Sequence, residues 1–331
     1  MRCICEPRKN LKGTFSQLCC SFPLPSTYII ANQQPRSTMS HGKKVVLVTG
    51  CTTGGIGYET AKAFERSGCR VYAAARRLDA ITGIESLDIE KVYIDVLDEK
   101  SVKEAVNHII EKEGRIDILF NNAGMGLACP LIDMSLETTR KLLDTNVTSV
   151  VLMSKEVAPH MIRQGSGLIV NVGSVTAYLA TPWGGLYAAS KAAVHSLSDA
   201  LRMELMPFGV NVTVVSPGAI KSNIGDNNLK AFHLPENSVY QSVLKYVLMR
   251  ANASQEPGCT PTAKFAKHVV GKCLKSSPPR YIDYGTLSNL FRFIRYMPRA
   301  ISEMIFYKRF GLLVLKKYVK DGNAGAKVLK N

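Results

Sequence analysis

Residues 45–57, with the sequence VVLVTGCTTGGIG, set the architecture of this 331-residue chain. The four apolar residues at positions 45–48 form a run too continuous for a strand with one face in water, which predicts a central parallel strand. The glycines that follow permit a tight turn and let the main chain approach a pyrophosphate, whose charge the N-terminus of the next helix stabilises. The stretch therefore predicts a strand, a phosphate-binding turn and a helix.

Strand-like and helix-like segments alternate from Lys43 to Gly218. Strands separated by helices of ten or more residues imply parallel βαβ units. We therefore predict an α/β fold with a doubly wound, Rossmann-type parallel sheet in one domain. The strands that we expect after the first are 70–75, 92–95, 116–120, 168–172 and 210–215, and the helices are 58–67, 99–112, 135–163 and 187–206.

Composition divides the chain into three expected parts. Residues 1–40 are rich in Ser, Thr and Pro with little acid, which is typical of a disordered or targeting leader such as a plastid transit peptide; alternatively, Met39 is the working start. Residues 41–260 are expected to form the dinucleotide-binding catalytic domain. The alternation of strands and helices stops after Gly218, and we expect residues 220–260 to form a mobile segment over the site. Residues 261–331 form a basic, apolar C-terminal extension.

The net charge of +16 lies at the two ends of the chain. Residues 1–38 contain five Lys or Arg and one acid, residues 262–331 contain fifteen and three, and the part between them contains 22 of each sign. A neutral core with a basic tail favours docking on an anionic surface and speaks against nucleic-acid binding. The cysteines show no paired spacing for zinc, so we expect no metal.

The C-terminal extension interleaves aromatic and aliphatic residues with Arg and Lys over residues 285–320. This composition is typical of a segment that lies in a membrane interface. The alternative is an ordinary C-terminal helix that covers the core with a solvated basic face. No run of eighteen apolar residues occurs in the sequence, so we predict no spanning helix.

Tyr187 and Lys191 are four residues apart in a predicted helix, which places the phenol and the ammonium on one face. A nearby cation favours the phenolate and lowers the pKa of a phenol, so such a tyrosine can exchange a proton with a substrate oxygen. The pair alone is weak evidence. Other polar or glycine-rich motifs, however, follow successive strands at the edge where open α/β sheets bind ligands: Asp95, the run 121–124, Ser174, and Pro217-Gly218.

These motifs in this order, with Ser174 thirteen positions before Tyr187, resemble the short-chain dehydrogenase/reductase family over residues 43–260. The resemblance implies that Tyr187 is the general acid and that Ser174 orients the substrate oxygen. It also implies that Lys191 lowers the pKa of the phenol and binds the nicotinamide ribose. Asn146 would hold a water of the proton relay, or instead be a helix residue that bonds to nearby main chain.

The resemblance also implies a nicotinamide cofactor. Arg76 and Arg77 stand where NAD-selective members carry an acid, and a guanidinium pairs well with a 2′-phosphate, which favours NADP(H). The glycine-rich loop has one more residue than is usual, because Gly54 and Gly55 are doubled, and a serine replaces the usual threonine after Pro217. The implied cofactor-binding residues are Gly50, Gly55, Ile56, Gly57, Arg76, Arg77, Asp95, Asn122, Ala123, Gly124, Tyr187, Lys191, Pro217, Gly218, Ile220 and Ser222.

Within the family, the chain is most similar to NADPH-dependent 1-acyldihydroxyacetone phosphate reductases. This similarity implies reduction of a lipid ketone to lysophosphatidate at the cytosolic face of the endoplasmic reticulum or a lipid droplet, and family members commonly form homo-oligomers. A steroid, retinoid or other long-chain keto substrate is the alternative. A non-catalytic dinucleotide-binding scaffold is a hypothesis of a different class, against which the complete set of Ser174, Tyr187 and Lys191 argues.

Overall fold

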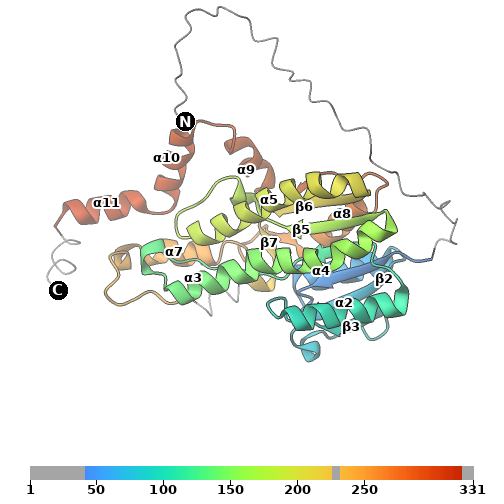
Figure 1. The fold of residues 1–331 in the computed structure, drawn as a ribbon. Helices are drawn as coiled ribbons and strands as arrows, with labels where there is room; N and C mark the ends of the chain where they lie inside the picture. The colour runs from blue at the N-terminus through green and yellow to red at the C-terminus, as the bar shows by residue number, and fades with distance from the viewer. Residues whose placement is uncertain (1–41, 226–231, 323–331) are drawn as a thin grey trace, which may run out of the picture. The chain divides into compact units, whose positions relative to one another are not determined.

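The computed structural model describes residues 42–225 and 232–322, and a seven-stranded parallel sheet lies at its centre (Figure 1). The strand order β3-β2-β1-β4-β5-β6-β9 reverses direction between β1 and β4, which is the switch point of a doubly wound sheet. This confirms the predicted fold class. The strands are β1 Val45–Thr49, β2 Arg70–Ala75, β3 Ile89–Tyr93, β4 Ile118–Asn121, β5 Gly167–Val172, β6 Val210–Pro217 and β9 Tyr281–Tyr284.

Helices cover both faces of the sheet. Val46 and Val48 of β1 lie in one core with side chains of α1 and α8, whereas Val45 and Leu47 lie in a second core with α2 and α4. Burial on both faces explains why β1 is apolar without alternation. The helices in these layers are α1 Ile56–Arg66, α2 Glu99–Glu113, α4 Ser149–Gln164, α5 Gly185–Leu205 and α8 Thr262–Cys273.

The long helical stretch expected over residues 135–163 is interrupted. It consists of α3 Leu136–Leu143, a π-helical turn at Asp144–Thr148, and then α4 (Figure 1). Ser135 caps the start, accepting a hydrogen bond from the Thr138 amide, and Gly165 ends α4 in a left-handed conformation. The extra residue of a π turn changes the direction of the side chains around it, and such turns occur often at functional sites.

Two expectations from the sequence are wrong. Strand β3 begins at Ile89 rather than at residue 92, because it is an edge strand whose half-exposed positions weaken the apolar pattern. The alternation also continues past Gly218, since α8 packs on α1 and β9 pairs with β6 as the seventh strand. Residues 262–284 therefore belong to the sheet domain and not to the C-terminal extension.

Beyond β9 the chain forms α9 Ser288–Ile294, α10 Arg299–Arg309 and α11 Leu312–Lys320, coloured dark orange to red in Figure 1. Phe306 is buried, but other apolar side chains of α10 and α11, such as Met304 and Leu313, are exposed. Neither described range of the chain contains a helix long and apolar enough to span a bilayer. The leader expected over residues 1–40 lies outside the described residues.

The segment expected to cover the site begins with β7 Ile220–Lys221, which pairs with β8 Thr260–Pro261. Between them, α7 Leu244–Ala251 places Arg250 near Tyr187, close enough for each charge to shift the pKa of the other group. The described part of the segment thus reaches the site, as expected; its mobility stays a prediction, and residues 226–231 lie outside the described residues.

Candidate functional site

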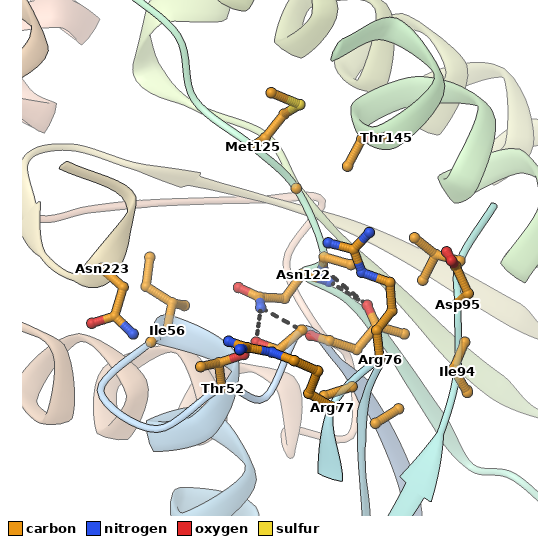
Figure 2. Close-up of a pocket in the computed structure, with 18 of the residues that line it drawn as sticks. Thr52, Ile56, Arg76, Arg77, Ile94, Asp95, Asn122, Met125, Thr145 and Asn223 are labelled. Atoms are coloured by element: carbon orange, nitrogen blue, oxygen red, sulfur yellow. Dashed lines mark hydrogen bonds between the residues drawn. The ribbon is translucent and has the colours of Figure 1, made fainter. Parts of the chain in front are cut away.

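A cavity of about 940 Å³ lies at the carboxyl ends of β1, β2, β3 and β4 (Figure 2). Its lining also includes the first residue of α1, so the positive end of that helix dipole faces the cavity. Ten of the residues predicted to bind the cofactor line it: Gly50, Gly55, Ile56, Arg76, Arg77, Asp95, Asn122, Ala123, Gly124 and Ser222.

The doubled glycines have different positions. Gly55 precedes α1 and lines the cavity, whereas Gly54 has a φ of +82° and lies against the side chain of Asn223. The additional glycine therefore provides a left-handed turn that other residues rarely adopt. Gly57 does not line the cavity, because it packs so closely against Asn122 and the Gly50 carbonyl that a Cβ atom would lie 2.4 Å and 2.6 Å from them.

Asn122 joins the glycine-rich turn to the end of β4. Its side-chain amide donates hydrogen bonds to the carbonyls of Thr49 (2.9 Å) and Gly50 (3.1 Å), drawn as dashed lines in Figure 2. In return, the Thr49 hydroxyl accepts from the main-chain amides of Asn122 and Ala123, each at 3.0 Å. These bonds fix two neighbouring strand ends at the switch point of the sheet.

Arg76 and Arg77 follow β2 directly, and Figure 2 shows both side chains among the residues of the cavity. Both are exposed, and neither forms an ion pair with a carboxylate of the described residues. Two guanidinium groups at this strand end fit a phosphate that carries two negative charges.

Pro217, Gly218 and Ile220 were expected to bind the cofactor, but they do not line the cavity. Gly218 donates a hydrogen bond to the Tyr284 carbonyl, and a Cβ atom at this position would lie 2.2 Å from the Thr286 carbonyl. Ile220 is buried. The physical reason is β9, the strand that the sequence did not predict, because its end packs against this turn.

Lys191 lies in α5 one turn after Tyr187, with its Nζ atom 5.9 Å from the centroid of the tyrosine ring. The ammonium is buried and donates a hydrogen bond of 2.9 Å to the main-chain carbonyl of Val172. Burial lowers the pKa of Lys191 to about 8, because an ammonium is less stable away from water.

Burial also raises the pKa of the Tyr187 phenol above its ordinary value, while the Ser174 hydroxyl and the Arg250 guanidinium act in the opposite direction. The sequence predicted that Lys191 would lower the pKa of the Tyr187 phenol, but in the described residues this pKa is raised. The desolvation of the phenol is the larger effect, and the cation whose charge acts on it is Arg250.

Ser174 follows β5 and is buried beside the phenol. Its hydroxyl accepts hydrogen bonds from the amide (3.1 Å) and hydroxyl (2.9 Å) of Thr176. Its main-chain amide donates to Nε2 of His195 at 3.4 Å. His195 is a residue of this site that sequence reasoning missed, although its position in α5, one turn after Lys191, was available as a signal.

Asn146 lies in the π-helical turn and is fully buried. Its side chain accepts from the Met125 amide (2.8 Å) and donates to the Met125 carbonyl (2.9 Å) and the Ser190 hydroxyl (3.0 Å). A Cβ atom at Gly124 would lie 3.1 Å from this side chain and 3.6 Å from the Lys191 ammonium. Asn146 therefore connects the β4 loop to α5.

Further lining residues were missed because the family resemblance assigned no role to them. Thr52, Met125, Thr145 and Asn223 line the cavity and flank predicted residues, so proximity to those motifs is a usable signal. In the two described ranges, no group of three or more His, Cys, Asp or Glu side chains is arranged to hold a metal.

Comparisons with known proteins identify the family of this chain. The chain is 34% identical over 286 residues to a short-chain dehydrogenase/reductase of Pestalotiopsis microspora, covering 85% of this chain and 99% of the relative. It is 33% identical over 254 residues to the NADPH-dependent 1-acyldihydroxyacetone phosphate reductase of Schizosaccharomyces pombe, covering 76% and 82%. A crystal structure of a short-chain dehydrogenase from Streptomyces avermitilis matches with a TM-score of 0.68 and 26% identity, covering 86% and 99%. A family model described as short chain dehydrogenase matches residues 44–231. The chain therefore belongs to the short-chain dehydrogenase family of oxidoreductases.

Proposed function

We propose that this protein uses NADPH to reduce the ketone of 1-acyl-dihydroxyacetone phosphate to the alcohol of lysophosphatidate. The observation that carries the proposal is that Ser174, Tyr187 and Lys191 lie close together in the fold. The chain also has a cavity at the carboxyl ends of its strands, where this family binds a dinucleotide. Arg76 and Arg77 favour NADPH over NADH, because they would pair with its 2′-phosphate. The relative from Schizosaccharomyces pombe, whose name states both this cofactor and this substrate, adds support.

The chemistry needs a hydride and a proton. When bound, NADPH supplies the hydride to the carbonyl carbon. Tyr187 donates the proton to the carbonyl oxygen, and Ser174 holds that oxygen by a second hydrogen bond, so negative charge that develops on it is stabilised. The high pKa of the phenol keeps Tyr187 protonated before the reaction. The Lys191 ammonium would hold the nicotinamide ribose, and Asn146 would fix a water that returns a proton to Tyr187.

A substrate panel tests this proposal. We expect purified full-length protein in lipid or detergent to consume NADPH with 1-palmitoyl-dihydroxyacetone phosphate and to form 1-palmitoyl-lysophosphatidate, identified by mass spectrometry. The panel includes a steroid ketone, retinal and a small soluble ketone. Turnover of the steroid or retinal alone would contradict the phosphorylated substrate and favour a steroid or retinoid substrate. Turnover of only the small ketone would contradict any lipid substrate.

We also propose that α10 and α11 dock on an anionic phospholipid surface, such as the cytosolic face of the endoplasmic reticulum or a lipid droplet. Helix α11 exposes Leu313, Val314 and Val319 together with the lysines 316, 317 and 320. This combination of exposed apolar and basic side chains suits a lipid interface. The extension also contacts the segment that precedes α5, because Trp183 donates a hydrogen bond of 3.1 Å to the Phe310 carbonyl.

Vesicle sedimentation tests the docking. We expect the full chain to sediment with phosphatidylcholine vesicles that contain phosphatidylserine, and the double variant Lys316→Glu/Lys317→Glu to remain in solution. A matched double variant on α2, Lys100→Glu/Lys103→Glu, should bind as the wild type does. Equal binding of all three proteins would contradict docking through α11.

A further inference from the structure

Arg250 lies in the last turn of α7 and reaches the start of the helix that carries Tyr187. Its Nε donates a hydrogen bond of 3.0 Å to the hydroxyl of Thr181, which is buried. Its guanidinium also lies over Gly184, the residue before α5, where a Cβ atom would be 2.9 Å from the nearest guanidinium nitrogen. The positive end of α5 and this cation therefore lie side by side, an arrangement that attracts an anion.

The positive charge of Arg250 has no negative partner among the described residues. None of their carboxylates lies within 4.0 Å of it, and the bond to Thr181 is the one hydrogen bond that its side chain makes to them. A guanidinium has five hydrogen-bond donors. Desolvation lowers the pKa of the Arg250 guanidinium. Leaving such a cation partly out of water without a partner destabilises the fold, so an anion that binds there recovers a large interaction energy.

Arg250 is also electrostatically coupled to the reacting phenol. Its charge lowers the pKa of Tyr187, and Tyr187 raises the pKa of Arg250. A charge with this effect lies near the position where the phenol meets the substrate carbonyl. In a dihydroxyacetone phosphate the carbonyl carbon is bonded to the CH₂ group whose oxygen carries the phosphorus, so the anion and the ketone lie close together.

We propose that Arg250 binds the anionic group of the substrate beside the ketone that Tyr187 protonates, and so selects phosphorylated lipids over neutral ones. This inference rests on the proposed function and deepens it by naming the residue that recognises the phosphate. A guanidinium forms two parallel hydrogen bonds with a phosphate, and binding a neutral sterol or retinoid leaves the cation unpaired. Arg250 thus acts on specificity, while Tyr187 acts on the chemistry.

The test compares one substrate with and without its charge. Wild type, Arg250→Ala and Arg250→Lys are assayed with 1-palmitoyl-dihydroxyacetone phosphate and with its dephosphorylated analogue, 1-palmitoyl-dihydroxyacetone. Lys245→Ala, an exposed lysine on the same helix, is the control. We expect Arg250→Ala to raise the KM for the phosphorylated substrate by about 10- to 100-fold, since a charged hydrogen bond contributes about 1.5–3 kcal/mol. The KM for the analogue should stay within about twofold, Arg250→Lys should be intermediate, and Lys245→Ala should match the wild type.

An equal rise in both KM values would overturn the inference, because it would mean that Arg250 only supports the structure. A binding measurement separates this failure from failure of the proposed substrate. Dihydroxyacetone phosphate and dihydroxyacetone are titrated calorimetrically into the NADP-loaded protein. Suppose that the wild type reduces neither lipid but binds dihydroxyacetone phosphate at least tenfold more tightly than Arg250→Ala does. This result would support the anion site and contradict the proposed lipid substrate. Equal affinities in wild type and Arg250→Ala would refute the anion site.

Discussion

The Lys191 ammonium and the Val172 carbonyl are joined by a hydrogen bond of 2.9 Å. Val172 ends β5, and Ser174 follows it two residues later, so this bond attaches the helix of Tyr187 and Lys191 to the strand that positions Ser174. This contact between a side chain and the main chain therefore helps to hold Tyr187, Lys191 and Ser174 in one site. Because this cation is buried, its charge depends on pH near neutrality.

Turnover should decrease as the pH rises through about 8, where Lys191 loses its proton. The lowered pKa means that the lysine is charged below this value and neutral above it, and only the charged form holds the nicotinamide ribose firmly. In a pH profile of kcat/KM, Lys191→Arg should shift the alkaline decline to higher pH, because a guanidinium keeps its proton. A wild-type profile that stays flat to pH 10 would contradict this role.

His195 should make the fold sensitive to acid. Burial lowers the pKa of its imidazole to about 4, whereas the unfolded chain takes up this proton near pH 6.5. A depressed pKa gives stability that is complete above pH 6.5 and is lost as the pH falls towards 4, by about 3 kcal/mol. Denaturant unfolding at both pH values should show this additional loss in the wild type but not in His195→Gln. The same loss in both proteins would assign it to the carboxylates.

Replacing Gly57 should disrupt the switch point of the sheet. A Cβ atom there would lie 2.4 Å from the Asn122 amide and 2.6 Å from the Gly50 carbonyl, and the main chain cannot easily move. We expect Gly57→Ala to lower the free energy of unfolding by about 1–3 kcal/mol and to weaken NADPH binding. Gly271→Ala is the matched control, because nothing lies within 4 Å of its added Cβ atom and alanine favours a helix. Equal stability of the two variants would contradict this packing.

Cofactor selectivity should depend on Arg76 and Arg77. The double variant Arg76→Ala/Arg77→Ala should raise the KM for NADPH by about 10- to 100-fold, since bonds between charged groups contribute about 1.5–3 kcal/mol. The KM for NADH should change little, because NADH has no 2′-phosphate. Arg66→Ala, an exposed arginine at the end of α1, serves as the control. A wild type with a lower KM for NADH than for NADPH would refute the assignment.

The buried parts of the fold could be predicted from the sequence because apolar runs and glycine turns report burial directly. Strands β1, β2, β5 and β6 and their helices begin and end within a few residues of the expected positions. Strand β9 was missed because it is short and lies at the sheet edge. Its pairing with the turn at Gly218, which does not line the cavity, was therefore not predicted either.

The site was predicted where local motifs encode it and missed where tertiary contacts create it. Ser174, Tyr187 and Lys191 are brought together as expected. The raised pKa of Tyr187 was not foreseen, because it depends on burial of the assembled site. Arg250 belongs to no motif and is far from Tyr187 in sequence, so only the folding of α7 over the site reveals it.

The most direct test of the account is the effect of Tyr187→Phe on NADPH oxidation with 1-palmitoyl-dihydroxyacetone phosphate. Removing the proton donor should lower kcat by about 10²- to 10⁴-fold while NADPH still binds. Tyr284→Phe, which changes a tyrosine on β9, should keep wild-type turnover, and thermal unfolding should verify that both variants are folded. A Tyr187→Phe variant that turns over at the wild-type rate would contradict the central claim that this phenol protonates the substrate.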